Sequence, residues 1–131
     1  FPVLGAFHSV VMGGLPDRFP KVRWGFLEAA ASWVPYMLTD IGARVNRLKG
    51  RGLISDLMQR NRLYVQCQTE EDIPYILSFA GEDNIVCGSD YSHADTSSEV
   101  EALQVIGQRE DISPEAKRKI LDDNAKALYA I

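Results

Sequence analysis

The feature that most constrains the fold is an alternation of short β-type runs with longer stretches of helical periodicity. Runs rich in β-branched and aromatic residues cover 22–27, 63–67 and 85–87. The expected helices cover 4–15, 33–48, 69 or 72 to 81, 97–107 and 113–128. Strands and helices that alternate at this spacing form right-handed parallel units with the helices outside. The sequence therefore predicts an α/β fold with three parallel strands, either a doubly wound sheet or part of a closed barrel.

Composition narrows the class of protein. With 131 residues, 46% of them hydrophobic, the chain is expected to form one domain over 1–131 with a core of its own. A net charge of −4 disfavours nucleic-acid binding, which needs a basic surface. No apolar run approaches the ~20 residues of a membrane helix. The glycine fingerprint for dinucleotides and the phosphate-binding Gly-Lys-Ser/Thr loop are both missing, so no cofactor of that kind is expected.

Cysteine usage and the first residue bear on location and length. Cys67 and Cys87 lie in strand-like runs and are predicted to be buried thiols rather than a disulfide. No signal-peptide pattern is recognised, so a cytoplasmic location is expected. The chain opens with Phe1 rather than methionine, and we expect it to be a piece of a longer protein.

A polar cluster directly follows the run at 85–87. Asp90, His93 and Asp95 offer two carboxylates and an imidazole within six residues of one another. In α/β proteins the carboxyl ends of the strands face the ligand crevice or the barrel mouth. Because a carboxylate that follows a strand through Gly-Ser has no capping role at that offset, Asp90 is the first candidate for chemistry.

The residues just after this cluster have a structural explanation. Thr96-x-x-Glu99 fits a capping box in front of a helix with the periodic apolar residues Val100, Leu103 and Ile106. The last helix has a still clearer start, since Ser113 is a good N-cap and Pro114 suits the first position.

If the three strands are neighbours, Glu28, the Cys67–Gln68 pair and Asp90 emerge at one rim. Two carboxylates and a histidine there can hold a divalent metal or act as an acid/base pair. Glu28 can equally be a hydrogen-bond acceptor at a helix start. A catalytic zinc usually has three protein ligands, often with two histidines. This chain has only His93 and His8, and His8 is expected to be a packing or surface residue.

A basic stretch follows the helix at 33–48. It contains Arg44, Arg47, Lys49, Arg51, Arg60 and Arg62. Cations near a helix C-terminus are favourable for dipole reasons alone, so a solvated surface is the default interpretation and an anion site the alternative.

Motifs spread over nearly the whole chain carry a family resemblance. They read RFPKVRWGFLE at 18–28, SWVPY at 32–36, DNIVCGSDYSH at 83–93 and KILDDNAKALY at 119–129. In this order they resemble the C-terminal half of an amidohydrolase-related enzyme, the group that includes the aminocarboxymuconate-semialdehyde decarboxylase-like proteins. The resemblance implies a metal-dependent (β/α)8 TIM barrel of which this chain supplies the last three parallel strands with their flanking helices.

The resemblance also implies roles for individual residues. Asp90 would be the metal-proximal carboxylate that also handles a proton. Many members have a histidine where Glu28 stands, while a glutamate is typical of one branch. The usual Tyr-Pro-His reads Tyr91-Ser92-His93 here. Glu28 and His93 are expected to contact the substrate or to lie behind the metal ligand Asp90. The His-x-His of the first strand and the histidine after the fifth would lie upstream of Phe1.

Three functions follow as hypotheses. The first is a metal-dependent hydrolase in which a divalent ion, expected to be zinc, activates water and Asp90 acts as base on a small-molecule substrate. The second is a non-oxidative decarboxylase of the same fold, with a carboxylate-binding cation from the basic stretch. The third is a non-catalytic half-barrel that pairs with a copy of itself. The 131 residues alone are expected to show no turnover.

Overall fold

The computed structural model describes residues 2–49, 56–93 and 98–131, and the side chains of these residues except those of 46–49. Three parallel strands, β1 (Trp24–Phe26), β2 (Leu63–Cys67) and β3 (Ile85–Cys87), form a sheet in the order β1-β2-β3. Gly25 pairs with Tyr64, and Gln66 pairs with Val86. The predicted α/β fold with three adjacent parallel strands is therefore confirmed.

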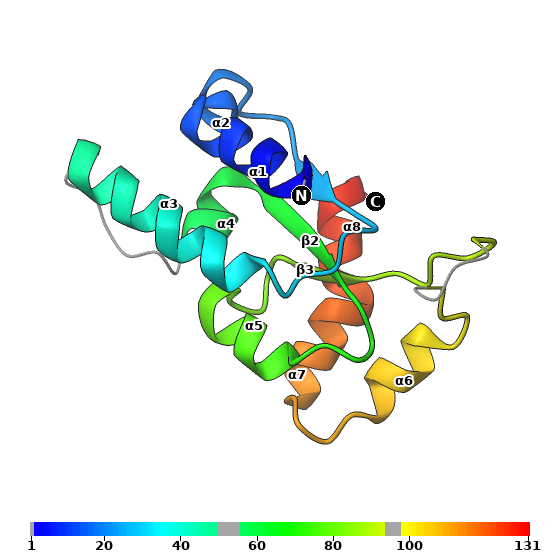
Figure 1. The fold of residues 1–131 in the computed structure, drawn as a ribbon. Helices are drawn as coiled ribbons and strands as arrows, with labels where there is room; N and C mark the ends of the chain where they lie inside the picture. The colour runs from blue at the N-terminus through cyan, green and yellow to red at the C-terminus, as the bar shows by residue number, and fades with distance from the viewer. Residues whose placement is uncertain (1, 50–55, 94–97) are drawn as a thin grey trace.

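Helices connect and flank these strands (Figure 1). They are α1 (Pro2–Met12), α2 (Leu15–Arg18), α3 (Val34–Lys49), α4 (Leu57–Asn61), α5 (Ile73–Ala80), α6 (Ala102–Gln108), α7 (Pro114–Arg118), the π-helical turn η2 (Lys119–Asp123) and α8 (Asn124–Tyr129). No helix in the described part of the chain is both long and apolar enough to cross a bilayer.

The two faces of the sheet are covered by different helices. Phe26 of β1 packs with Phe7 of α1, and Trp33 at the start of α3 completes the aromatic group, with ring centroids 5.1 to 6.2 Å apart. Gly25 faces the other side, where Leu128 of α8 lies 3.4 Å from the position of an added Cβ. Figure 1 shows α1 and α3 on one side of β2 and α8 on the other.

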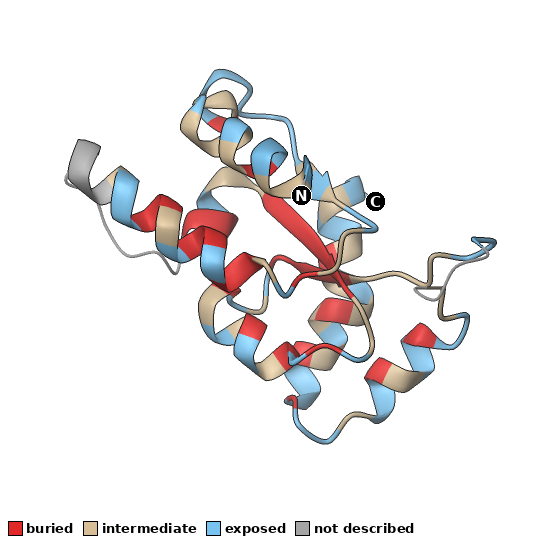
Figure 2. Cartoon of the chain, viewed as in Figure 1, coloured by how far each residue is buried: buried red, intermediate tan, exposed pale blue. Residues whose placement is uncertain are grey.

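The core is one cluster that joins the sheet to the surrounding helices, and it includes Phe7 of α1, Ile76 of α5 and Ile120 of η2. All five residues of β2 are buried, and α3 presents a buried stripe of Val34, Met37, Leu38 and Ile41 (Figure 2). This stripe matches the predicted apolar face of the helix at 33–48. Burying each such side chain contributes roughly 1.5–3 kcal/mol, so the sheet and α3 form the stable base of the fold.

The N-terminal elements differ from the predicted ones. The helix expected over 4–15 ends at Met12, because Gly14 adopts a left-handed φ of 66°. The short helix α2 follows, with Pro16 in its first turn. The strand expected over 22–27 is limited to Trp24–Phe26. The short helix α4 had no predicted counterpart, since its five residues are too few for a periodic pattern.

Helix starts were predicted with mixed success. Ser113 caps α7 as predicted, with its Oγ accepting from Ala116 N at 3.0 Å. Ser32 is a typical cap residue just before the expected helix at 33–48, but its hydroxyl donates to the carboxylate of Glu71 instead of capping α3. The start expected at residue 97, with the cap at Thr96, lies outside the described residues.

The apolar periodicity around α6 was a misleading signal. Val100 and Leu103 are 69% and 56% exposed, and the described helix begins only at Ala102. Ala102 and Ile106 are its buried residues. Of the expected apolar face, Ile106 packs against the protein, whereas Val100 and Leu103 are exposed to solvent.

The C-terminal helical segment is anchored to the sheet by a buried asparagine. Asn124 is 3% exposed, and its Nδ2 donates to the carbonyl oxygens of Glu82 and Ile85, both at 2.7 Å. These bonds join the start of α8 to the start of β3. The sequence analysis did not identify Asn124, because its role depends on a segment about 40 residues away.

Candidate metal centre

A carboxylate–histidine cluster lies at the carboxyl ends of β1 and β3. One ligand atom from each of Glu28, Asp90 and His93 lies within 4.8 Å of the others. Glu28 follows β1 by two residues, and Asp90 follows β3 by three. The side chain of Asp90 is 7% exposed, while that of His93 is 56% exposed. The structure thus brings together the three residues that the sequence analysis selected, at the predicted end of the sheet.

Asp90 and His93 interact directly. His93 Nδ1 lies 2.7 Å from Asp90 Oδ1. The backbone supports this pair, since the Asp90 carbonyl oxygen accepts from His93 N at 3.2 Å and from Ser98 Oγ at 3.1 Å. The carboxylate is thereby held in a tight turn with the imidazole on its solvent side. Such an arrangement suits a group that exchanges a proton with solvent.

Both loops of the cluster contain strained backbone. Four non-glycine residues with left-handed φ lie here: Glu28 (60°), Ala30 (54°), Asp90 (49°) and Ser92 (73°). The left-handed conformation costs an L-residue roughly 1–2 kcal/mol. Such residues persist where the surroundings fix them, and they cluster at functional sites.

Gln66 links the two loops and was missed by the sequence analysis. Its Oε1 accepts from Glu28 N at 3.2 Å. Its amide also lies against Gly88, because a Cβ added there would be 2.8 Å from Gln66 Cδ. Gly88 therefore allows the side chain to pass. A polar residue among apolar neighbours in a short strand was the available signal.

The Cys67–Gln68 pair lies at the carboxyl end of β2, between the ends of β1 and β3 as predicted, but the side chain of Cys67 does not reach the rim. Cys67 pairs with Cys87 in the sheet register and is fully buried among core residues. Gln68 points its backbone N–H at Glu71, at 2.8 Å. Because side chains alternate along a strand, Gln66 rather than Cys67 shares a face with Gly25 and Val86.

The two cysteines are free thiols, as predicted. Cys67 is buried and Cys87 half-buried. Burial raises the pKa of Cys67 to about 12 and that of Cys87 to about 11. Both are therefore protonated at neutral pH and serve as packing groups.

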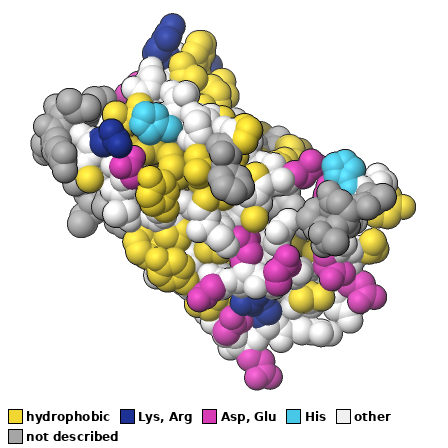
Figure 3. Space-filling view, in the orientation of Figure 1, with side chains coloured by type: hydrophobic (Ala, Val, Ile, Leu, Met, Phe, Trp, Pro, Cys, Tyr) yellow, Lys and Arg dark blue, Asp and Glu magenta, His cyan; other side chains and the backbone are white. Residues whose placement is uncertain are grey.

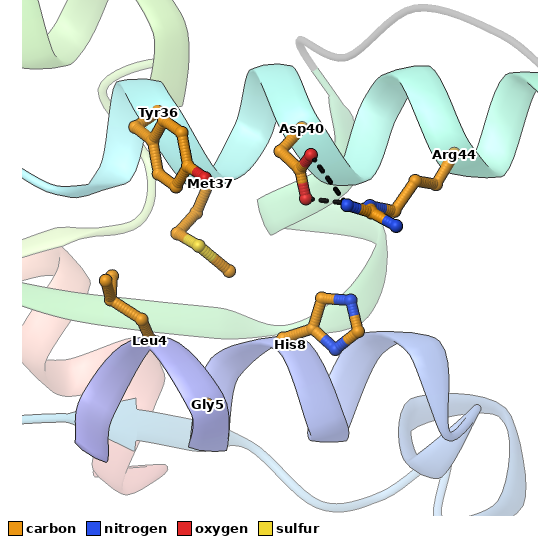
Figure 4. A pocket seen from close by; sticks show the side chains of 7 residues that line it. All are labelled: Leu4, Gly5, His8, Tyr36, Met37, Asp40 and Arg44. Atoms are coloured by element: carbon orange, nitrogen blue, oxygen red, sulfur yellow. Dashed lines mark hydrogen bonds and ion pairs between the residues drawn. The ribbon is translucent and has the colours of Figure 1, made fainter. Parts of the chain in front are cut away.

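A separate hollow of about 340 Å³ lies between α1 and α3 (Figure 4). His8 of α1 faces Asp40 and Arg44 of α3 there, and the apolar side chains of Leu4 and Met37 line the hollow beside them. Arg44 binds both oxygens of Asp40, at 2.8 and 3.1 Å, and lowers the pKa of that carboxyl. Figure 3 shows hydrophobic side chains gathered over α1 and α3 and acidic ones over the region of α5 to α7. His8 thus lies outside the carboxylate–histidine cluster.

The described arginines of the basic stretch are already engaged. Arg44 pairs with Asp40, and Arg60 lies 3.7 Å from Asp56. Arg62 donates to the carbonyl oxygens of Val22 and Pro16, which precede β1. The contacts of Arg62 precede β1 and β2 and so lie at the amino end of the sheet, opposite the cluster. The described part of the stretch thus behaves as structural surface.

The donor set of the cluster fits a divalent ion. Carboxylate oxygen and imidazole nitrogen are zinc ligands, and catalytic zinc sites use three protein ligands. Ligand atoms ~2.1 Å from a tetrahedral ion lie about 3.4 Å apart, so the most widely spaced pair has to close by up to about 1.4 Å. Glu28 and His93 are exposed and free to make this adjustment. Two carboxylates also balance a charge of +2.

Solved structures with the same fold are amidohydrolase-type (β/α)8 barrels. The amidohydrolase map2389c from Mycobacterium avium subsp. paratuberculosis K-10 matches with a TM-score of 0.77 and 21% identity over 95% of this chain and 32% of its own. The 5-carboxyvanillate decarboxylase LigW from Sphingomonas paucimobilis matches with a TM-score of 0.62 and 21% identity over 93% of this chain and 38% of its own. The chain thus spans about a third of the length of these proteins, and the predicted partial barrel is confirmed.

Sequence comparison defines the family. No curated protein sequence matches the chain. The family model described as amidohydrolase matches residues 3–131, which is nearly the whole chain. This match agrees with the resemblance noted in the motifs at 18–28, 83–93 and 119–129. The chain therefore belongs to the amidohydrolase family.

Proposed function

We propose that this chain supplies metal ligands and the catalytic base of a metal-dependent hydrolase. The observation that supports this most is the convergence of Glu28, Asp90 and His93 within 4.8 Å at the carboxyl ends of the strands. In barrel enzymes of this kind the active site lies at that end. Zinc is the proposed ion, since the donor set combines carboxylate oxygens with an imidazole.

In this proposal each residue has its own task. Asp90 and Glu28 would hold the ion through their carboxylate oxygens, and His93 would either complete the set or orient Asp90 through its Nδ1 contact. A zinc-class ion supplies a Lewis acid that polarises a carbonyl or carboxyl group and lowers the pKa of water.

Proton transfer is the task of the chain's own groups. Asp90 is nearly buried and accepts a proton at its carboxylate. His93 is bonded to Asp90 and more than half exposed, so it passes that proton to solvent. Gln66 fixes the Glu28 backbone during these steps through its bond to Glu28 N. The proposed substrate is a small molecule. The proposed location is the cytoplasm, because Cys67 and Cys87 are free thiols and a reducing compartment keeps thiols free.

The test is zinc affinity, measured by competition with a chromophoric chelator. Wild-type protein, Asp90→Asn and Glu28→Gln are compared, with Asp17→Asn as a matched control because Asp17 is an exposed aspartate of α2. Loss of one ligand is expected to weaken binding at least tenfold, whereas the control stays within twofold. Equal affinity of wild type and Asp90→Asn would contradict the proposed site.

A decarboxylase is the second candidate. It is favoured by the structural likeness to LigW, which is described as a 5-carboxyvanillate decarboxylase. The same metal cluster would serve, but the substrate carboxylate would need a cation other than Arg44, Arg60 and Arg62, which are engaged elsewhere. Product analysis on a full-length parent protein separates the two: release of CO2 from an aromatic carboxylic acid such as 5-carboxyvanillate would identify the lyase. Hydrolysis of amides or esters without CO2 release would identify the hydrolase.

A further inference from the structure

The loop between β1 and α3 needs external support. It presents Glu28 to Asp90 and His93, yet Glu28 and Ala30 both adopt left-handed φ angles without being glycine. Trp33 Nε1 donates to the carbonyl oxygens of Ala29 and Ala30, at 3.0 and 2.9 Å. These contacts are local to the loop. They do not fix it relative to the neighbouring strand.

Glu71 provides a connection from the next strand. This residue follows β2, is 8% exposed, and belongs to the loop that leads into α5. Its Oε1 accepts from Ala31 N at 2.9 Å and from Ser32 N at 2.6 Å, and also from Ser32 Oγ. Its Oε2 accepts from Gln68 N at 2.8 Å and from Ala31 N at 3.1 Å. One buried carboxylate thus joins the loops that follow β1 and β2.

The chemistry of these contacts calls for a carboxylate. Every partner is a donor, and the donors approach both oxygens from two different loops. A glutamine in the same place accepts with one oxygen only, while its NH2 group faces an N–H of one loop. That substitution therefore detaches either the β1 loop or the β2 loop, with little change in side-chain volume.

We propose that Glu71 is a positioning residue for the metal ligand Glu28. By holding Ala31 and Ser32, it keeps the strained residues 28–30 in the conformation that brings the Glu28 carboxylate to Asp90 and His93. Glu71 itself does not belong to the cluster of ligand atoms. This inference rests on the proposed metal site.

The experiment measures zinc affinity and amide hydrogen exchange of the protein with Glu71→Gln. The matched control is Glu70→Gln, because Glu70 is the adjacent glutamate, is exposed, and bonds only to the Thr69 hydroxyl among the described residues. Glu71→Gln is expected to weaken zinc binding tenfold to a hundredfold, in the range of mutations that remove a partner behind a metal ligand. Exchange at Ala31 and Ser32 is expected to rise, and the control to remain within twofold of wild type.

Each outcome decides the inference. If wild type binds zinc and Glu71→Gln binds it within twofold, although exchange at Ala31 and Ser32 has risen, the positioning role is wrong and the metal site stands. If wild type itself binds no zinc, the metal site fails and the inference fails with it. If Glu71→Gln does not fold, Ser32→Ala decides: removal of one donor is expected to weaken binding about threefold, and unchanged affinity would overturn the inference.

Discussion

The imidazole of His93 and the carboxylate of Asp90 form a direct pair, with Nδ1 2.7 Å from Oδ1. One partner is buried and the other reaches solvent, since the Asp90 side chain is 7% exposed and the His93 side chain 56% exposed. A histidine that bonds a ligating carboxylate fixes its orientation and basicity. His93 is therefore expected to influence metal binding even where it is not itself a ligand.

Replacing His93 tests this coupling. His93→Ala is expected to weaken zinc binding about tenfold to a hundredfold. His93→Gln should lose less, because its amide N–H is able to donate to Asp90. His8→Ala is the matched control, since His8 lies in the hollow between α1 and α3. Chelator competition gives the affinities, and equal losses for the His8 and His93 variants would contradict the pair's role.

Gly88 leaves room for the buried side chain of Gln66. Gly88→Ala would place a Cβ 2.8 Å from the Gln66 amide, so we expect the free energy of unfolding to fall by about 1–3 kcal/mol. Gly5→Ala is the control, because nothing lies within 4 Å of its added Cβ, and it should stabilise α1 by about 0.5–1 kcal/mol. Urea denaturation measures both. In a Gln66→Ala background, Gly88→Ala should lower the free energy of unfolding by less than it does in wild type. Equal losses in the two backgrounds would refute the clash.

The buried thiol of Cys67 predicts a loss of stability at alkaline pH. Folding raises its pKa from 9.0 to about 12, so above pH 9 the unfolded chain releases a proton that the folded chain retains. The contribution of Cys67 to the free energy of unfolding therefore falls as pH rises through this window, by up to about 1.4 kcal/mol per pH unit, and is constant below it. Urea denaturation at pH 8 and pH 10 measures the slope, which should be smaller in Cys67→Ala. Identical slopes would exclude this cause.

The edges of the sheet predict self-association of the chain. Among the described residues, β1 pairs only with β2, although parallel sheets normally occur in buried, fully paired settings. Val22 and Leu27 flank β1 and are 41% and 43% exposed. Light scattering is expected to give a dimer mass or more at micromolar concentration, and Leu27→Lys to lower it. A monomer mass for wild type at all concentrations would argue against the self-pairing half-barrel.

Local signals in the sequence were sufficient for β2, for β3 and for the start of α7. The β-branched runs at 63–67 and 85–87 match β2 and β3, and Ser113 with Pro114 marks the start of α7. Asp90 was recognisable because it follows an apolar strand through a glycine. These features depend on residues close together in the sequence, so they can be predicted without the structure.

Contacts between distant segments could not be predicted in the same way. Gln66 and Glu71 bind backbone N–H groups 38 to 40 residues away, so their roles arise only when the loops pack together. The periodic Val100 and Leu103 failed as core predictions for the related reason that periodicity does not specify what covers a helix face. Ser32 failed as a cap because Glu71 competes for its hydroxyl.

The proposed function depends most on one ion bound by Glu28, Asp90 and His93. X-ray diffraction at the zinc absorption edge, on crystals grown with zinc, locates that ion directly. We predict an anomalous peak about 2.0–2.2 Å from a carboxylate oxygen of Asp90, with Glu28 as a further ligand. Zinc bound elsewhere, or not at all, with the Asp90 carboxylate still bonded only to protein groups, would contradict the account.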